Sequence, residues 1–242
     1  MNISSTSYPL KMFPLLSGSA LKVIAVLSMM ADHSAYYFLE ENTVAYSVMR
    51  CFGRIAFPVF ALLVAEGYTY TRNRMRYFLS LLTFAIVSEV PWYLLNGADG
   101  THNVMFTLAL GVAAMAAFDR LNEHKNVSLI LVLFTALFAG LLGMDYGWRG
   151  ILMIFLFHLF GNLYNRQRSN SQGVRLLQLA FTFPFMAHYG ITGALLACSI
   201  IFLYDGTRGF IKGNLAKYGF YAFYPLHLMV IWLLEQTSNF TY

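Results

Sequence analysis

The chain of 242 residues is rich in apolar side chains and poor in charge: 58% of its residues are hydrophobic and 11% are Asp, Glu, Lys or Arg. A water-soluble domain usually carries about 25% charged residues. The composition therefore excludes an ordinary soluble domain and predicts an integral membrane protein. The net charge of +5 includes no block of consecutive basic residues, so no nucleic-acid partner is expected. Cys51 and Cys198 are isolated in apolar segments, which predicts neither a disulfide framework nor a metal site.

Apolar segments of about 17–25 residues are long enough to cross a bilayer as helices. The first segment contains Asp32 and lacks a basic leader and a cleavage site, so we expect a retained helix. The stretch 174–204 fits two short helices bent at 188–190 or one tilted helix with a broken end. We predict a single domain over 1–242, an all-α polytopic transmembrane bundle of about nine helices, with eight or ten as alternatives: 19–38, 48–70, 76–96, 103–119, 127–143, 147–164, 174–189, 190–204 and 216–235.

Basic side chains indicate the orientation, because Lys and Arg crowd cytoplasmic loops. With nine helices, most of the 16 basic residues fall on one side. We therefore place the amino terminus in the cytoplasm and the carboxyl terminus outside. The exceptions are Arg50, Arg54 and Arg149, which belong on the outer side or inside the membrane. The basic residues on the cytoplasmic side are Lys11, Lys22, Arg72, Arg74, Arg76, Arg120, Lys125, Arg166, Arg168, Arg175, Arg208, Lys212 and Lys217.

Several ionisable side chains are predicted at similar depths. At about 1.5 Å per residue, His33 lies about 16–17 Å from the cytoplasmic boundary, Glu89 about 20 Å and His227 about 15 Å. Intramembrane ionisable groups cost at least ~2.5–3.5 kcal/mol each and mark functional sites by default. We therefore favour a shared site. Buried ion pairs that lock helices together, such as Arg54 with Asp32 or Glu89, remain the alternative. Four further polar residues lie at the outer ends of neighbouring helices: His102, Asn103, Asp145 and Arg149.

Three prolines accompany these ionisable residues. Proline has no N–H to bond the carbonyl four residues earlier, so it frees a backbone acceptor within a helix. The acceptors freed in this way lie at or near Arg54, Glu89 and His227. The prolines are Pro58, Pro91 and Pro225.

Asp32 and His33 are adjacent, so on a helix their side chains point about 100° apart. They cannot both face one partner. If one lines a cavity, we expect the other to pack against a neighbouring helix or to anchor the first through a third residue. His33 is the natural proton acceptor near neutral pH, and Asp32 is expected to set the local electrostatics or to pair with Arg54.

Six segments between residues 18 and 235 form an ordered set of motifs: LKVIAVLSMMADHSAYYF, GRIAFPVFALLVAEGY, LLTFAIVSEVPWYL, HNVMFTLALGV, DYGWRGILMIFLFHLF and FYAFYPLHLMVIWLL. In this order they resemble the TraX family of bacterial inner-membrane proteins. The family's namesake acetylates the amino terminus of conjugative pilin. The resemblance implies a multi-pass protein of the bacterial inner membrane. It also implies a branch of the transmembrane acyltransferases, which deliver an acyl group from cytoplasmic acyl-CoA across the membrane.

The resemblance can be carried over to particular positions. The family's intramembrane Asp-His pair falls at Asp32 and His33. Its GR-x-AFP segment falls at 53–58, its acidic residue before proline at Glu89, and its YPLHL ending at 224–228.

These residues suggest an acyl-transfer site. His33 is expected to deprotonate an amine or hydroxyl acceptor that arrives from outside, and Arg54 to stabilise the tetrahedral oxyanion. Glu89 would orient the acceptor or pair with a cation, as would Asp145. Acetyl-CoA or another acyl-CoA is the expected donor. The predicted residues are, for catalysis, His33, Asp32, Arg54 and Glu89; for substrate binding, Asp145, Arg149, His102, Asn103, His227 and Tyr224; and for the donor, Arg72, Arg74, Arg76 and Glu66.

Other interpretations remain open at this stage. The basic loop at 72–76 is expected to bind coenzyme A phosphates by charge, and a simple positive-inside anchor is the alternative. Glu66 either touches the donor or pairs locally. His158 lies in an apolar run and is interpreted as a packed histidine. The acceptor is a peptide amino terminus, a glycan or a lipid-linked molecule. The alternatives to an enzyme are a proton-coupled transporter and a non-enzymatic membrane assembly factor.

Overall fold

The computed structural model describes residues 16–121, 123–166, 171–211 and 213–239. Lys11, Arg168 and Lys212 lie outside these ranges. Within them every regular element is a helix, and two isolated β-bridges join residues between helices. The helices are α1 (Gly18–Phe38), α2 (Val44–Gly53), α3 (Ala56–Tyr70), α4 (Arg74–Asn96), α5 (Val104–Arg120), α6 (Lys125–Leu141), α7 (Gly147–Arg166), α8 (Ser171–Ala187), α9 (Ile191–Phe202) and α10 (Asn214–Asn239).

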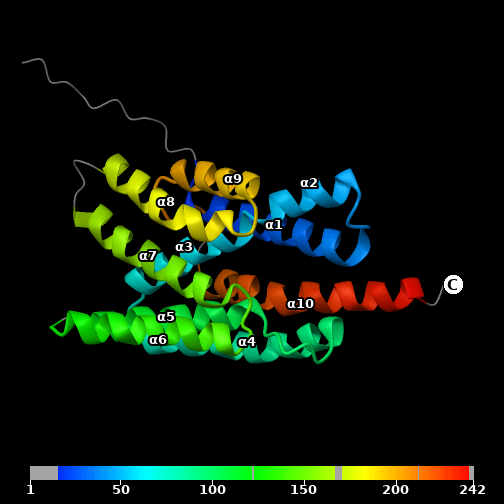
Figure 1. Cartoon of the computed structure of the whole chain (residues 1–242), viewed down its shortest axis with the longest axis horizontal. Helices are drawn as coiled ribbons and strands as arrows, with labels where there is room; N and C mark the ends of the chain where they lie inside the picture. Colours follow the sequence, from blue (N-terminus) through cyan, green and yellow to red (C-terminus); the bar gives the residue numbers. More distant parts are fainter. Residues whose placement is uncertain (1–15, 122, 167–170, 212, 240–242) are drawn as a thin grey trace, which may run out of the picture.

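The prediction of an all-helical protein with nine helical segments is confirmed. Each predicted segment corresponds to one helix, except that 48–70 corresponds to α2 and α3 in succession. The helices lie roughly along the long axis of the molecule (Figure 1). The ambiguous stretch 174–204 forms two helices, and Gly190 separates them with a φ of 136°, a conformation that only glycine adopts without strain.

The α2–α3 pair begins earlier than predicted and contains a break. Thr43 caps α2, because its side chain accepts a hydrogen bond from the N–H of Tyr46, so the helix starts at Val44 rather than at 48. The chain leaves α2 at Gly53 and enters α3 at Ala56. Pro58 has no N–H for the carbonyl of Arg54, which places the break where the sequence predicted a freed acceptor.

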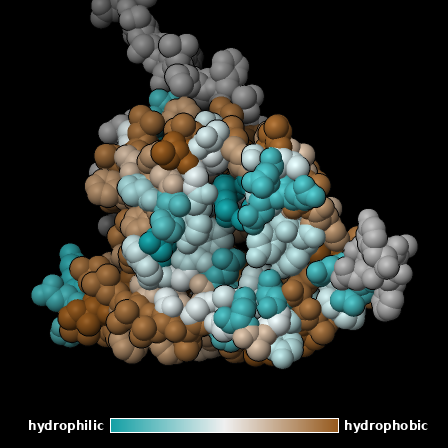
Figure 2. All heavy atoms as spheres, turned by 45° about the vertical axis from the view of Figure 1, so that its right-hand side comes forward, coloured by the Kyte–Doolittle hydropathy of each residue, from teal (hydrophilic) through white to brown (hydrophobic). Residues whose placement is uncertain are grey.

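Two stretches of the described chain are long and apolar enough to cross a membrane, Val44–Tyr70 and Arg74–Asn96. Two shorter helices are also apolar, Lys125–Leu141 and Ile191–Phe202. Large hydrophobic side chains are exposed on the flanks of the bundle, whereas hydrophilic residues gather around a hollow at the end turned forward in Figure 2. These features are those of a membrane protein.

Helix α3 occupies the centre of the bundle. It packs against α1, α5, α7 and α9, and small side chains such as Ala61 and Ala65 are buried along it. Small residues let neighbouring helices approach closely. By contrast, α10 packs mainly against α4 and makes few contacts with α1. This arrangement leaves space between α1, α3 and α10.

Candidate functional site

A cavity of about 680 Å³ occupies this space, with walls from α1, α3, α4, α5 and α10. Along α1 it is lined by Lys22, Val26, Met29 and His33, whose spacing of three or four residues puts them on one helix face. Lys22 and His33 lie 11 residues apart, so the cavity is about 16–17 Å long between them. We call its two ends the basic end, with Lys22, Arg208 and Lys217, and the histidine end, with Asp32, His33, Asp145, Tyr146 and Tyr224.

The loop between α9 and α10 completes the basic end. Three hydrogen bonds tie it to the start of α1. The N–H of Gly18 donates to the carbonyl of Thr207 at 2.7 Å, the Ser19 hydroxyl donates to the carbonyl of Arg208 at 2.9 Å, and the N–H of Ile211 donates to the Ser19 hydroxyl oxygen at 2.7 Å. The loop therefore holds Arg208 beside Lys22 and Lys217 on the cavity wall. Three cations around one opening provide a site for an anionic group.

Of the residues predicted to bind the donor, the structure brings only Glu66 to the cavity. The Tyr204 hydroxyl donates a hydrogen bond to Oε2 of Glu66 at 2.6 Å. The loop arginines do not line the cavity. Arg74 forms an ion pair with Asp119 at 3.1 Å, and Arg72 and Arg76 are exposed. The sequence could not separate these cations from those of the basic end, because both groups lie at helix ends that were predicted to face the cytoplasm.

At the histidine end, two imidazoles from opposite ends of the chain meet. Nδ1 of His33 lies 2.6 Å from Nε2 of His227. Nδ1 of His227 lies 3.1 Å from the carbonyl oxygen of Phe223, one turn earlier on α10. His227 was predicted to bind substrate, but it does not line the cavity. Instead it contacts the side chain of His33, which does.

Asp32 forms its ion pair with Arg50. Of the two roles expected for Asp32, the pairing with Arg54 is wrong. A guanidinium nitrogen of Arg50 lies 2.6 Å from Oδ2 of Asp32, and both side chains are about one-fifth exposed. Gly53 lies against Asp32, which brings α2 close to α1 and places Arg50 on the carboxylate. The Arg54 side chain lies instead towards Gly193 and the ring of Tyr189, and Arg54 is not among the residues that line the cavity.

Asp32 and His33 have separate partners, as their adjacency predicted. Both nevertheless line the cavity, whereas the sequence predicted that only one would. The cavity therefore meets two faces of α1 at this end, where Gly53 and Tyr224 also belong to its wall.

The turn between α6 and α7 contributes Asp145 and Tyr146. Tyr146 has a φ of +62°, the only positive φ at a non-glycine residue in the described ranges. Its ring stacks on Phe57 at 3.7 Å between centroids, and the Thr107 hydroxyl donates to the carbonyl of Asp145. Such strain persists only where surrounding contacts enforce it, and it concentrates at functional sites. Burial raises the pKa of Asp145 to about 6; among its charged neighbours Asp32 raises it, and Arg54 and Arg50 lower it.

Three other predicted site residues form a separate cluster. Glu89 on α4 contacts Nδ1 of His102, and the Asn103 side-chain amide donates to Glu89 at 2.6 Å. Asn103 is fully buried and caps α5 through the N–H of Met105. None of the three lines the cavity. They fasten α4 to the start of α5, which corresponds to the ion-pair alternative.

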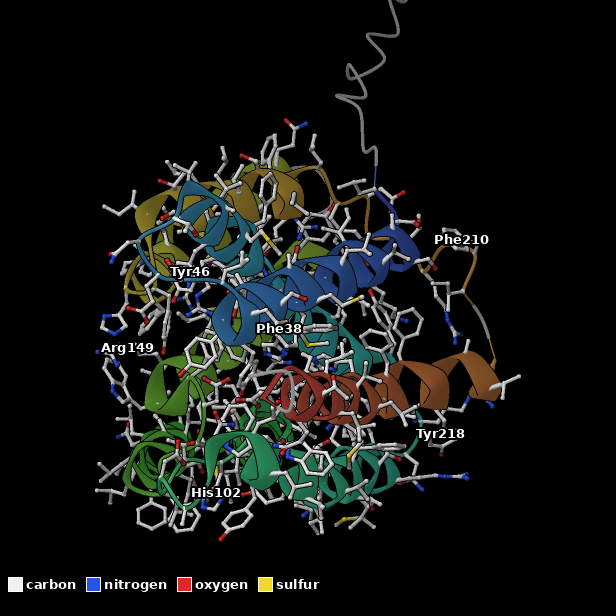
Figure 3. The ribbon with its side chains drawn as sticks, turned by 90° about the vertical axis from the view of Figure 1, so that its right-hand side faces the viewer. Phe38, Tyr46, His102, Arg149, Phe210 and Tyr218 are labelled. Carbon is white, nitrogen blue, oxygen red and sulfur yellow. The ribbon has the colours of Figure 1, made fainter. Side chains whose placement is uncertain are left out.

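Arg149 also lies outside the cavity wall. Its guanidinium covers the ring of Trp148 at 4.4 Å. Figure 3 shows Arg149 at the left edge and His102 at the lower edge of the bundle, both away from the middle, where α1 and α10 lie.

Sequence reasoning missed a second polar cluster. His158 is 2% exposed and packed, as predicted, but its Nε2 lies 3.0 Å from Oδ1 of Asp119. The Tyr68 hydroxyl donates to the other carboxylate oxygen at 3.0 Å, and Arg74 pairs with it. The cluster joins α3, α4, α5 and α7. The sequence signal that could have revealed this cluster is Asp119, a carboxylate at the end of an apolar helix.

Helices with the character of membrane segments surround a long cavity. The cavity is cationic at one end and carries an imidazole at the other. These features are those of a helical membrane protein with an internal cavity. The chain belongs to the TraX family: the family model described as TraX protein matches residues 17–235. It is 30% identical over 240 residues to the probable fimbrial assembly protein FimC, serogroup H1, of Dichelobacter nodosus, covering 89% of this chain and 94% of that protein. No solved structure matches the chain.

Proposed function

We propose that the chain crosses the bacterial inner membrane nine times, with the amino terminus in the cytoplasm. Two lines of support are independent of each other. The basic residues concentrate at alternate connections between segments, as the positive-inside tendency requires. In addition, apolar side chains such as Leu27, Ile86, Phe134 and Leu226 are exposed along the flanks, where lipid would cover them. In this orientation the basic end of the cavity opens towards the cytoplasm.

We further propose that the protein is an acyltransferase that uses acyl-CoA, acetyl-CoA in the first instance, as its donor. The observation that carries this proposal is the single cavity with three cations at one end and His33 at the other. Lys22, Arg208 and Lys217 suit the phosphates of coenzyme A. The middle of the cavity is lined by apolar residues such as Phe60 and Leu108, which suits a slender arm. A donor held in this way presents its thioester near His33.

The residues of the histidine end then have distinct roles. The amine or hydroxyl of the acceptor attacks the thioester carbon, and its proton passes to His33. The carbonyl electron pair moves to oxygen, where a donor must stabilise the oxyanion. The C–S bond then breaks, and the thiolate takes the proton back from His33 to leave free coenzyme A.

We assign the oxyanion donor to Tyr224 in place of Arg54. Tyr224 lines the cavity, and its buried hydroxyl donates no hydrogen bond in the described part of the chain. A tyrosine hydroxyl in an apolar site is a suitable donor to an oxyanion. Arg54 does not reach the cavity wall. The Asp32–Arg50 pair holds α1 and α2 together beside the reacting groups.

The acceptor is proposed to be an amine or hydroxyl reached from the outer side: a peptide amino terminus, a glycan or a lipid-linked molecule. The similarity to a probable fimbrial assembly protein favours a component of a surface fibre. A non-enzymatic role in fimbrial assembly is the second candidate function, since that protein's name specifies assembly and no reaction.

Purified protein in lipid with labelled acetyl-CoA tests the proposal. We expect label to leave coenzyme A in the wild type, and His33→Ala to release it about 10²–10⁴-fold more slowly, the usual contribution of general base catalysis. Thermal unfolding of both proteins controls for folding. Equal release by two equally stable proteins would remove the catalytic role of His33. Absence of coenzyme A binding would favour the assembly factor.

A further inference from the structure

We infer that His227 is a positioning residue that fixes the tautomer of His33 and so leaves its Nε2 unprotonated; this inference rests on the proposed function only for its catalytic consequence. The two imidazoles form an in-plane hydrogen bond. Their planes differ by 6° and their centroids lie 4.9 Å apart, while Nδ1 of His33 and Nε2 of His227 lie 2.6 Å apart. The distance between the two nitrogens is much shorter than the distance between the two ring centroids. Two coplanar rings with this relation meet edge to edge. They are not stacked face to face.

The direction of the hydrogen bonds follows from the carbonyl of Phe223. A carbonyl oxygen only accepts, so Nδ1 of His227, 3.1 Å away, must carry the hydrogen. In a neutral imidazole one nitrogen is a donor and the other an acceptor. Nε2 of His227 is therefore the acceptor, and Nδ1 of His33 donates to it. Hydrogen positions follow here from the chain of partners.

This chain leaves the lone pair of His33 on Nε2. That nitrogen forms no hydrogen bond with the described residues, and His33 lines the cavity. Tyr37 and Tyr224 face the ring edge-on at 6.5 and 6.4 Å between centroids, so they restrict its rotation. The base is thus held with its acceptor nitrogen available before a substrate arrives.

His227 also affects the charge that develops during the reaction. When Nε2 of His33 takes a proton from the acceptor, the ring becomes an imidazolium with hydrogen on both nitrogens. Its Nδ1–H then donates more strongly to Nε2 of His227. The proton that was taken up returns from Nε2 to the leaving thiolate, so His227 needs neither to gain nor to lose a proton.

Because His227 does not line the cavity, its replacement should change kcat and leave the KM for acetyl-CoA unaltered. In His227→Ala, His33 loses its acceptor and either tautomer becomes accessible. We expect kcat to fall about 10–100-fold, the loss that follows removal of the hydrogen-bond partner that orients a metal-ligating histidine. His227→Gln retains a side-chain carbonyl that can accept from His33 and should recover most of this loss.

A spectroscopic measurement separates the inference from the proposed function. In protein labelled with ¹⁵N-histidine and embedded in lipid, His33 should show a protonated Nδ1 and an unprotonated Nε2. His33→Gln identifies the signals. His227→Ala should give a mixture of tautomers, and His227→Gln should keep one.

The outcomes are distinct. A wild-type His33 protonated at Nε2 and not at Nδ1, or a His227→Ala protein with kcat within about twofold of wild type, would overturn the inference. If the wild type shows no His33-dependent turnover, the acyltransferase proposal fails. The predicted tautomers, if observed, would then still support the positioning role of His227.

Discussion

Gly53 on α2 lies directly against the carboxylate of Asp32 on α1. A Cβ atom at position 53 would lie 2.2 Å from Oδ1 and 2.6 Å from Cγ of Asp32, far inside van der Waals contact. Arg50, one turn earlier on α2, reaches Oδ2 of the same side chain at 2.6 Å. The close approach at Gly53 is therefore what aligns the ion pair beside His33.

Replacement of Gly53 by alanine should separate α2 from α1. The added methyl group must displace Asp32 or the helix, and overpacking of this kind costs about 1–3 kcal/mol of unfolding free energy. We expect a lower melting temperature in lipid or detergent and a loss of turnover. Gly161→Ala on α7 is the matched control, because no atom lies within 4 Å of its added Cβ. That variant should be neutral or slightly stabilised through helix propensity. Equal stability of the two variants would contradict the close approach.

A double-mutant cycle tests the interaction between Asp32 and Arg50. Arg50→Ala leaves a largely buried carboxylate without its cation. We expect a loss of about 2–3 kcal/mol, less than the 3–5 kcal/mol of a fully buried pair, because both side chains are about one-fifth exposed. Arg50→Ala combined with Asp32→Asn removes both charges and should be more stable than Arg50→Ala alone. The measurement is thermal unfolding of the four proteins. Strict additivity would show that the two side chains do not interact.

Much of the fold could be predicted from the sequence, because it depends on segment length and apolar composition. The nine segments are of this kind. The break that divides 48–70 into α2 and α3 was not predicted, although the acceptor freed by Pro58 at Arg54 was. Partner choice was harder to predict. Arg50 and Arg54 lie one turn apart, and the glycine contact at position 53 decides which of them meets Asp32. That contact depends on how two helices pack, which periodicity does not specify.

Only part of the candidate site could be predicted, because the sequence indicates the depth of a residue along its helix but not which residue of another helix it contacts. Counting along helices gave the depth of His33, and this residue does line the cavity. Depth alone could not show that Glu89 contacts His102 and does not line the cavity. Nor could it pair His33 with His227, which lie 194 residues apart in the sequence.

The raised pKa of Asp145 predicts a pH-dependent stability. Burial lifts it from 3.8 to about 6, so folding favours the protonated carboxyl. This contribution is largest at low pH, declines as the pH rises from about 4 to about 6, and changes no further above that range. At low pH the raised pKa of Asp145 contributes about 3 kcal/mol to the free energy of unfolding. Asp145→Asn should therefore become increasingly more stable than wild type as the pH rises. Melting temperatures of both proteins across this range give the difference, and a difference independent of pH would be inconsistent with a buried, titrating Asp145.

Tyr224→Phe tests the oxyanion role of the hydroxyl. Removal of one oxyanion donor usually lowers kcat about 10²–10³-fold. The ring remains, so the KM for acetyl-CoA and the melting temperature should change little. Tyr218→Phe is the matched control on α10, because Tyr218 does not line the cavity. A kcat for Tyr224→Phe close to that of Tyr218→Phe would mean that the hydroxyl does not contact the reacting carbonyl.

We predict that the three cations of the basic end bind coenzyme A. Lys22→Gln, Arg208→Gln and Lys217→Gln each remove one charge from the cavity wall. Each should weaken binding by about fivefold, which corresponds to about 1 kcal/mol for a partly exposed charge. Titration with coenzyme A at low and high salt measures this, and the losses should shrink as salt screens the phosphates. Arg72→Gln and Arg76→Gln are the controls, since both side chains are exposed outside the cavity. If these controls weaken binding and the three cavity variants do not, the donor binds at the α3–α4 loop, and the proposal that the cavity is the donor channel fails.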